Sequence, residues 1–509
     1  MKPKVKIIFA FLICQLFATQ VLAAGYQVKT LDPEQLKLSP VTLPDISKFS
    51  SESIERLLAA ARKKKPGTVS RKMVHGQVEL RMLYSDKGLL NMGLRQKSLP
   101  STLVIEGGVM TLQEVSRAFP RLLVHLGGNE YLAKLPIAVG IHATLIIQNK
   151  VLKLSQERGA FLANGGVLFL QGGALLGWIE STDLPALYSG DKHAYRPFFV
   201  GWGGSRTYFN RTKAAHLGYF RSKSYGITLT SYHVKPTEKL FQRRDFDFSQ
   251  PPTGWFVNSH FSDIYYGFYC HEAKDVIIIN NTYADNIIYG IDPHDSSSGL
   301  IIAKNNIYGT RVKHGIIVSR EVNNSFIFQN ETHDNTLSGI MLDRQCTNNQ
   351  VVANMVYRNG SDGITLYESG DNLVAENIVF SNKAHGVYLR NSEHVNLLDN
   401  TIINNGGFGV FLQTQDLLAL GHKRDLQKDP YRQKISAILG GGIIAQNKSG
   451  SIFVKNAEKF CIYHVFFDQN GGKKHQLKFG GDLKQYHNQI VQSLWGEHGV
   501  AVLSRIGEP

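Results

Sequence analysis

The 509-residue sequence predicts an all-β fold, a right-handed parallel β-helix solenoid with short helical capping elements. Three observations predict it: a glycine recurs at a fixed interval, an asparagine recurs at the same interval, and the short apolar strands between them show no helical pattern. A leucine-rich repeat has a similar period but requires a leucine and asparagine signature that this chain lacks. The glycines stand 23 to 25 residues apart, at Gly267, Gly290, Gly315, Gly339, Gly363, Gly386 and Gly409.

The recurring asparagines end a second short strand in each coil. They are Asn280, Asn305, Asn330, Asn354, Asn377 and Asn400. Side-chain amides stacked from coil to coil can satisfy turn backbone that would otherwise be unpaired. We therefore expect these asparagines to be structural.

Residues 101–470 are expected to form the catalytic β-helix domain. Two apolar segments at 103–108 and 167–173 resemble less regular coils of the same solenoid. The charged segment 415–432 breaks the period, which indicates a loop or lid.

The two ends of the solenoid require covers, because an open β-helix end exposes strand edges. Residues 24–100 are expected to be a partly helical N-terminal capping region, with an amphipathic helix at 50–65 over the first coil. Residues 471–509 are expected to be a C-terminal segment that packs on the last coils, with apolar residues at helical spacing from 483 to 495.

Residues 1–23 have the pattern of an export signal peptide. Lys2, Lys4 and Lys6 precede an apolar run, and Val21-Leu22-Ala23 supplies small residues for cleavage. The apolar run is too short to favour a membrane span, and no other stretch has the pattern of one. We expect an exported protein with no membrane span.

The chain is basic, with a formal net charge of +15 that becomes +12 once the three lysines of the signal segment are removed. This excess favours an anionic partner. Export argues against nucleic acid and favours an anionic polysaccharide or a membrane surface. The basic run at 62–65 is better explained as a solvated helix end.

Three cysteines follow the signal segment, Cys270, Cys346 and Cys461. They allow at most one intramolecular disulfide, and the sequence leaves their redox state open. Their spacing matches no zinc motif, and buried thiols are the simpler interpretation. We expect neither a metal nor a cofactor.

The side chains that follow each repeated glycine separate into two sets, because alternate residues of a strand face opposite sides. Positions one and three are apolar and are expected to face the core. Positions two, four and five form a polar, aromatic and ionisable stripe along the solenoid axis. Since coils stack about 4.8 Å apart, this stripe fits a polymer better than a small molecule. Its candidate substrate-binding residues are Tyr269, His271, Lys313, Arg344, Tyr367 and Arg390.

The segment Asp292-Pro293-His294-Asp295 concentrates the ionisable groups of the stripe. It places two carboxylates around one histidine, and Arg320 lies one coil away. An Asx-Pro turn with a satisfied histidine is the alternative explanation. A proline inside a ladder removes a hydrogen bond, which indicates a locally distorted coil.

These residues carry a family resemblance. Tyr289-Gly290-Ile291-Asp292-Pro293-His294-Asp295, His314 to Val322 and Asp362 to Asn372 resemble the periplasmic mannuronan C5-epimerases of alginate-producing bacteria. Gly201-Trp202-Gly203-Gly204 and Ser222 to Gly226 also match, so the resemblance covers roughly residues 190 to 415. It implies a periplasmic right-handed β-helix that acts on polymannuronate, needs no calcium and associates with the alginate export proteins.

The resemblance also implies roles for single residues. His294 is the expected base and Arg320 the partner that neutralises the substrate carboxylate, with water as the acid. The chemistry agrees, because a proton α to a carboxylate can be removed only when the carboxylate charge is neutralised. Asp292 or Asp295 would orient the His294 ring. Tyr367 is the alternative proton donor, although its ordinary pKa of about 10 is unfavourable.

Several alternatives stay open. Arg344, Arg390 and Lys313 are expected at subsites for neighbouring uronates, and salt bridges to Asp343 and Glu368 compete with that role. A lyase shares the proton abstraction and then expels the O4 substituent. A non-catalytic scaffold of the export complex would bind alginate without chemistry. A tailspike-like glycosidase is disfavoured, because the stripe lacks a carboxylate pair free of basic partners.

Overall fold

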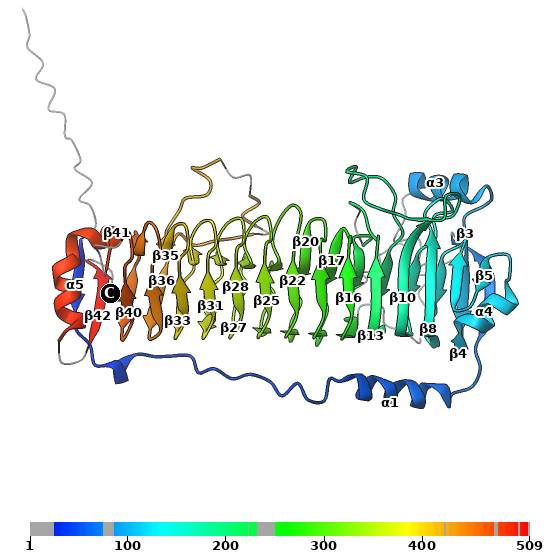
Figure 1. Cartoon of the computed structure of the whole chain (residues 1–509), viewed down its shortest axis with the longest axis horizontal. Coiled ribbons are helices and arrows are strands. Elements are labelled where there is room, and N and C mark those ends of the chain that lie inside the picture. The colour runs from blue at the N-terminus through cyan, green and yellow to red at the C-terminus, as the bar shows by residue number, and fades with distance from the viewer. Residues whose placement is uncertain are drawn as a thin grey trace, which may run out of the picture.

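The computed structural model describes residues 25–74, 86–221, 223–231, 250–421, 424–427, 429–472, 477–496 and 499–506. In these residues the chain winds into a long solenoid, and the strands of successive coils pair side by side into sheets that extend along its axis (Figure 1). Nearly all strand pairs of the coils are parallel and in regular register, so the predicted parallel β-helix is confirmed. The predicted signal peptide, residues 1–23, lies outside the described residues. Within them, no helix is long and apolar enough to cross a membrane.

One face of the solenoid is a sheet that carries the predicted stripe. Each glycine-led strand pairs with the corresponding strand of the next coil, so equivalent side chains form columns along the axis. In order, its strands are β2 (Thr68–Met73), β3 (Ser101–Glu106), β7 (Ile137–Val139), β9 (Leu162–Asn164), β12 (Phe199–Trp202), β14 (Gly226–Thr230), β17 (Tyr266–His271), β20 (Tyr289–His294), β23 (Ile316–Ser319), β26 (Ile340–Asp343), β29 (Ile364–Tyr367), β32 (Val387–Arg390), β35 (Phe408–Gln413), β38 (Gly450–Lys455) and β41 (Phe479–Gly481).

The remaining faces come from paired short strands in each coil. In the first coils they are β4 (Gly108–Thr111), β5 (Leu123–Gly127), β6 (Glu130–Ala133), β8 (Ala143–Ser155), β10 (Val167–Ile179), β11 (Leu184–Pro185), β13 (Arg206–Ala215), β15 (Thr253–Val257) and β16 (His260–Ser262). In the regular coils one row is β18 (Ile277–Ile279), β21 (Ile301–Ala303), β24 (Phe326–Phe328), β27 (Gln350–Val352), β30 (Leu373–Ala375), β33 (Val395–Leu398), β36 (Ser436–Gly440) and β39 (Lys459–Tyr463). The other row is β19 (Thr282–Ala284), β22 (Asn306–Tyr308), β25 (Glu331–His333), β28 (Met355–Tyr357), β31 (Ile378–Phe380), β34 (Thr401–Ile403), β37 (Ile443–Ala445) and β40 (Phe466–Asp468).

The turn between the two rows holds a buried asparagine ladder. Each amide donates to the side-chain oxygen of the next asparagine, at 2.9 to 3.0 Å. The ladder begins at Asn281, which donates to Asn305, and the prediction of Asn280 is wrong. Asn280 is exposed at a left-handed position, φ 56°, one residue before the ladder. A second ladder, which the sequence interpretation missed, contains Asn335, Asn359, Asn382, Asn405 and Asn447.

The inward set of the glycine-led strands forms the core as predicted. Ile291, Ile316, Ile340 and Ile364 are fully buried in one continuous cluster that runs through the solenoid. The outward set is less exposed than expected. Asp292 and Met341, at position two, are only 2% and 7% exposed, although the alternation of the strand points them away from the core.

The N-terminal segment runs along the outside of the solenoid. β1 (Tyr26–Lys29) pairs antiparallel with β42 (Val500–Arg505) at the far end, and the chain then returns past the coils to α1 (Ser51–Arg62) (Figure 1). This is the amphipathic helix expected at 50–65, but it packs on the outer face beside β8 and β10, through Ile54 and Leu58.

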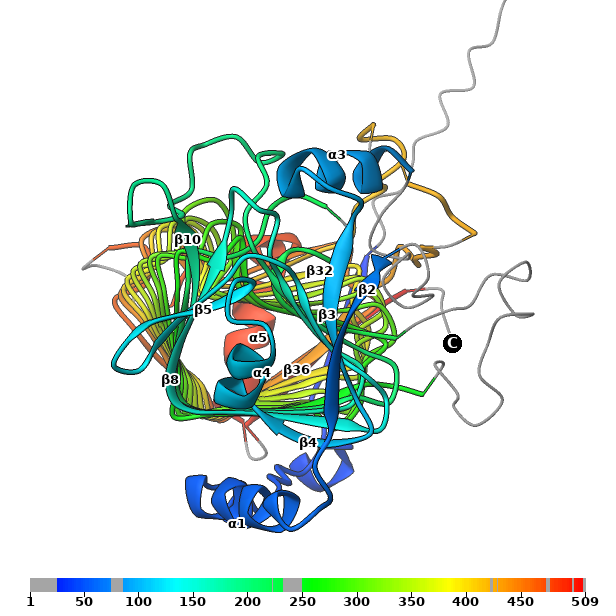
Figure 2. The same cartoon turned by 90° about the vertical axis from the view of Figure 1, so that its right-hand side faces the viewer.

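Other helices cover the ends. α4 (Leu112–Ala118) lies across the opening of the first coils (Figure 2), and its Leu112 and Val115 join the core. At the other end the 3-10 helix η4 (Asp482–Tyr486) and α5 (His487–Leu494) insert Leu483 and Ile490. Helix α3 (Asp86–Gln96) and the short 3-10 helix η1 (Pro33–Gln35) lie outside the coils.

Candidate active site

The segment after β20 brings the predicted catalytic side chains together. His294 is the last residue of β20, and its Nδ1 lies 2.7 Å from Oδ2 of Asp295. Oδ1 of Asp295 lies 3.7 Å from Nη1 of Arg320 on the next coil. Asp295 therefore stands between the imidazole and the guanidinium, and all three side chains are partly accessible to solvent.

The backbone of each turn presents these side chains in the same way. Asp295 and Arg320 follow their strands with φ of 37° and 60°, and Arg344 repeats the geometry at 62°. The N–H of Asp295 donates to Ser319 O at 3.0 Å, and the N–H of Arg320 donates to Asp343 O at 2.8 Å. The same left-handed geometry recurs at turns along the solenoid, and here the main-chain bonds to the next coil hold the side chains of Asp295 and Arg320 in register.

The coil that carries His294 departs from the regular ladder, as its proline predicted. On the β17 side, Asp292 pairs with Tyr269 and His294 with His271. On the β23 side, only Ile291 and His294 keep their partners, Ile316 and Ser319. Pro293 has no N–H to donate, so the ladder opens beside the site.

Asp292 lies beneath the site in a cluster of tyrosines. Burial raises the pKa of its carboxyl to about 7, and the nearby His294 opposes part of that rise. Burial, reinforced by the charge of Asp292, also raises the pKa of Tyr269 and Tyr289, so both phenols keep their protons. The ring of Tyr269 lies 5.9 Å from that of His294, centroid to centroid.

The imidazole of His294 is tuned by its neighbours. Burial lowers its pKa, but the close contact with Asp295 and the charges of Asp292 and Asp295 more than offset this, and the pKa lies above its ordinary value. Burial would raise the pKa of Asp295, yet the contact with His294 keeps it below its ordinary value. The contact is short, although the Nδ1 hydrogen does not point at the oxygen. Such contacts often align only when substrate binds.

The other predicted stripe residues spread along the neighbouring coils. His271 lies 3.7 Å from Asp295, so it belongs to the same cluster. Lys313 donates to the hydroxyl of Tyr289 at 3.0 Å. Arg344 lies one coil beyond Arg320 and pairs with Asp343 at 3.4 Å, as the salt-bridge alternative anticipated.

Tyr367 and Arg390 lie farther from His294. Arg390 pairs with the fully covered carboxylate of Glu368 at 2.8 Å and lies over the ring of Tyr367, 3.6 Å from its centroid. Tyr367 is three coils from His294, and burial raises the pKa of its phenol. Both properties disfavour it as the proton donor of the site.

Sequence interpretation missed the loop residues that complete the site. The segment between β35 and β36 breaks the period, as predicted, and folds back over the stripe. Asp429 pairs with Arg320 and Arg344, and Arg424 pairs with Glu368 at 2.8 Å. Because this loop lies outside the repeat, the period cannot predict which side chains of the stripe its residues contact. Its charged composition was the one feature of the sequence that pointed to such contacts.

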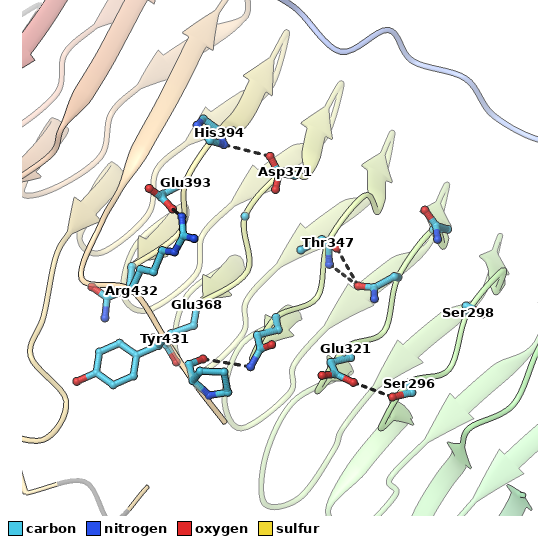
Figure 3. A pocket seen from close by; sticks show the side chains of 16 residues that line it. Ser296, Ser298, Glu321, Thr347, Glu368, Asp371, Glu393, His394, Tyr431 and Arg432 are labelled. Atoms are coloured by element: carbon cyan, nitrogen blue, oxygen red, sulfur yellow. Dashed lines mark hydrogen bonds and ion pairs between the residues drawn. The ribbon is translucent and has the colours of Figure 1, made fainter. Parts of the chain in front are cut away.

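A cavity of about 840 Å³ lies beside the stripe, along the turns that follow its strands. Glu321 and Asp371 line it from the coils, and Tyr431 and Arg432 bound it from the loop (Figure 3). His294, Asp295 and Arg320 do not line it. The cavity therefore borders the candidate catalytic cluster without containing it, because Ser296 and Glu321 of its lining directly follow Asp295 and Arg320.

Metal chemistry has no evident ligand set in the part of the chain that the structure describes, since no group of three or more His, Cys, Asp or Glu residues there could hold a metal ion. The thiols of Cys270, Cys346 and Cys461 are free and buried. Their burial agrees with the simpler interpretation of the cysteines.

Fold and site together define a class, a right-handed β-helix protein with an ionisable stripe on one face. The model of the right-handed β-helix region matches residues 242–354 and 296–419. The chain is 40% identical over 447 residues to the mannuronan C5-epimerase of Pseudomonas putida, which covers 87% of this chain and 84% of that protein. It is 42% identical over 473 residues to mannuronan C5-epimerase AlgG of Azotobacter vinelandii, covering 92% and 87%. The chain belongs to the mannuronan C5-epimerase family.

A solved structure agrees with this assignment. The crystal structure of the periplasmic alginate epimerase AlgG superimposes with a TM-score of 0.79 at 38% identity, over 84% of this chain and 99% of that one. The expected resemblance in family and fold is confirmed.

Proposed function

We propose that the protein is a periplasmic epimerase that converts β-D-mannuronate to α-L-guluronate within polymeric alginate by inverting C5. The observation that carries the chemistry is the row of His294, Asp295 and Arg320 on adjacent coils of one open face. Family membership supplies the substrate.

The reaction begins with removal of the C5 proton, which is α to the uronate carboxylate. Arg320 pairs with that carboxylate and stabilises the charge that develops on it. Asp295 lies 2.7 Å from Nδ1 of His294, and once substrate binding aligns this contact Asp295 would accept the Nδ1 hydrogen, which leaves the lone pair of Nε2 as the base. Because the pKa of His294 is raised, its neutral form becomes available at a higher pH than that of an ordinary imidazole.

Reprotonation from the opposite face of the ring completes the inversion. We assign the donor to water, because Tyr367 is three coils away and pairs with Arg390. Tyr269 and His271 bound the site on the preceding coil, where they would contact the neighbouring sugar. Lys313 and Arg344 provide positive charge for the carboxylates of neighbouring sugar units. Arg390 acts indirectly, through its ion pair with Glu368.

Incubation of the purified protein with polymannuronate tests the function. Guluronate signals in the NMR spectrum with unchanged chain length are expected, whereas ultraviolet absorbance from unsaturated chain ends would identify a lyase. His294→Ala and Arg320→Ala should each lower kcat by about 10²-fold or more. Full epimerisation by both variants would refute the residue assignment.

Retained polymer binding by these variants would separate catalysis from a scaffold role. Association with alginate export and modification proteins stays a prediction. Co-purification from periplasmic extracts, with a strain lacking the polymer as control, would test it.

A further inference from the structure

The loop between β35 and β36 places a carboxylate on the two arginines of the stripe. Oδ2 of Asp429 lies 3.2 Å from Nη2 of Arg320 and 3.5 Å from Nη1 of Arg344. The two arginines occupy equivalent positions on successive coils, so this carboxylate bridges one repeat of the solenoid. Asp429 is 8% exposed.

The loop is held in this position by contacts outside the arginine pair. Arg424 donates from Nη1 to Glu368 at 2.8 Å and from Nε to the main-chain oxygen of Asp429 at 2.7 Å. Gln345 donates to the main-chain oxygen of Pro430 at 3.1 Å. The backbone of Asp429 is therefore fixed independently of its side chain.

The charge balance at this point opposes the binding of a polyanion. Arg320 already faces Asp295 at 3.7 Å, and Arg344 faces Asp343 at 3.4 Å. Asp429 adds a third carboxylate to two guanidiniums. A uronate carboxylate binds a guanidinium well only when the guanidinium is not already neutralised.

Access to the guanidinium of Arg320 is limited in a second way. Its Nε is buried without a hydrogen-bond partner, so the substrate can approach only the edge formed by Nη1 and Nη2. Asp429 takes the Nη2 end of that edge. A bidentate uronate must exchange with it.

We propose that Asp429 is an intramolecular stand-in for a uronate carboxylate. It fills the subsite between Arg320 and Arg344 until a carboxylate of the polymer displaces it. This inference rests on the proposed function and assigns Asp429 as a specificity residue. A neutral sugar polymer has no group that can replace Asp429, whereas a polyuronate presents one at each unit.

The test compares polymannuronate binding, measured by isothermal titration calorimetry, with the KM for epimerisation. Asp429→Asn keeps the side-chain size and the main-chain oxygen that Arg424 binds. It should bind polymannuronate about fivefold more tightly and lower KM in parallel, since displacing one partly exposed ion pair costs about 1 kcal/mol. Asp429→Glu should restore the weaker binding.

Asp425→Asn is the matched control, because it removes the same charge from the same loop at an exposed position. It should leave binding unchanged. Equal or weaker binding by Asp429→Asn, or no binding of polymannuronate by any form, overturns the proposal. Tighter binding by Asp429→Asn in a protein that epimerises nothing would instead retain the subsite and reject the proposed function.

Discussion

Replacing Glu368 by glutamine should destabilise the protein by about 3–5 kcal/mol, the cost of removing one partner from a buried ion pair. The Glu368 side chain is 2% exposed, and the two arginines that it pairs with are 13% and 7% exposed. It accepts from Arg390 at 2.8 and 3.3 Å and from Arg424 at 2.8 Å. Glutamine keeps the shape but removes the charge, which leaves two buried guanidiniums uncompensated.

Arg424 anchors the loop over the stripe, so the loss should be felt first there. Urea-induced unfolding followed by circular dichroism measures the stability, and amide hydrogen exchange around Arg424 measures the local opening. Glu393→Gln is the control one coil away, because Glu393 is 20% exposed and its partner Arg432 is 81% exposed at 3.7 Å. It should cost less than about 1 kcal/mol. A loss below about 1 kcal/mol for Glu368→Gln as well would refute the reasoning.

Two further predictions concern the base and the ladder. Asp295→Asn removes the contact that raises the pKa of His294, so the acid limb of the pH profile of kcat/KM should move to lower pH; an unmoved limb would contradict this assignment. Asn354→Ala removes four buried hydrogen bonds, two donated by the side-chain amide and two accepted from Asn330, and should cost about 3–4 kcal/mol in urea unfolding. Asn129→Ala, in an exposed turn, should cost under about 0.5 kcal/mol, and equal losses would count against the ladder.

Within the regular coils, the sequence was enough to locate the site. In a solenoid, the number of residues between a side chain and the repeated glycine of its coil determines the face on which that side chain lies. His294 and Arg320 stand at neighbouring offsets from their glycines, and the structure places them one coil apart with Asp295 between them. The same logic failed by one residue at Asn280. Two adjacent asparagines fit the period equally well, and only the left-handed turn decides which one enters the ladder.

Burial of the stripe could not be predicted from the alternation of side chains. Asp292 points out of the coil, yet the tyrosines around it exclude water and raise its pKa to about 7. Alternation gives direction, whereas exposure depends on side chains that arrive from other coils. The sequence pattern also predicted the helix at 50–65 but not where on the solenoid it packs. Its apolar face could equally cover the end of the solenoid or one of its sides.

The sequence by itself determined the solenoid, the inward and outward sets, and the column that holds His294 and Arg320, because each coil contacts only its neighbours. The tertiary structure alone decided that α4 covers the first coil and that Asp429 reaches Arg320 and Arg344 from more than eighty residues away. Those contacts join segments outside the repeat. No period fixes their register, and only packing and charge pairing select where they lie.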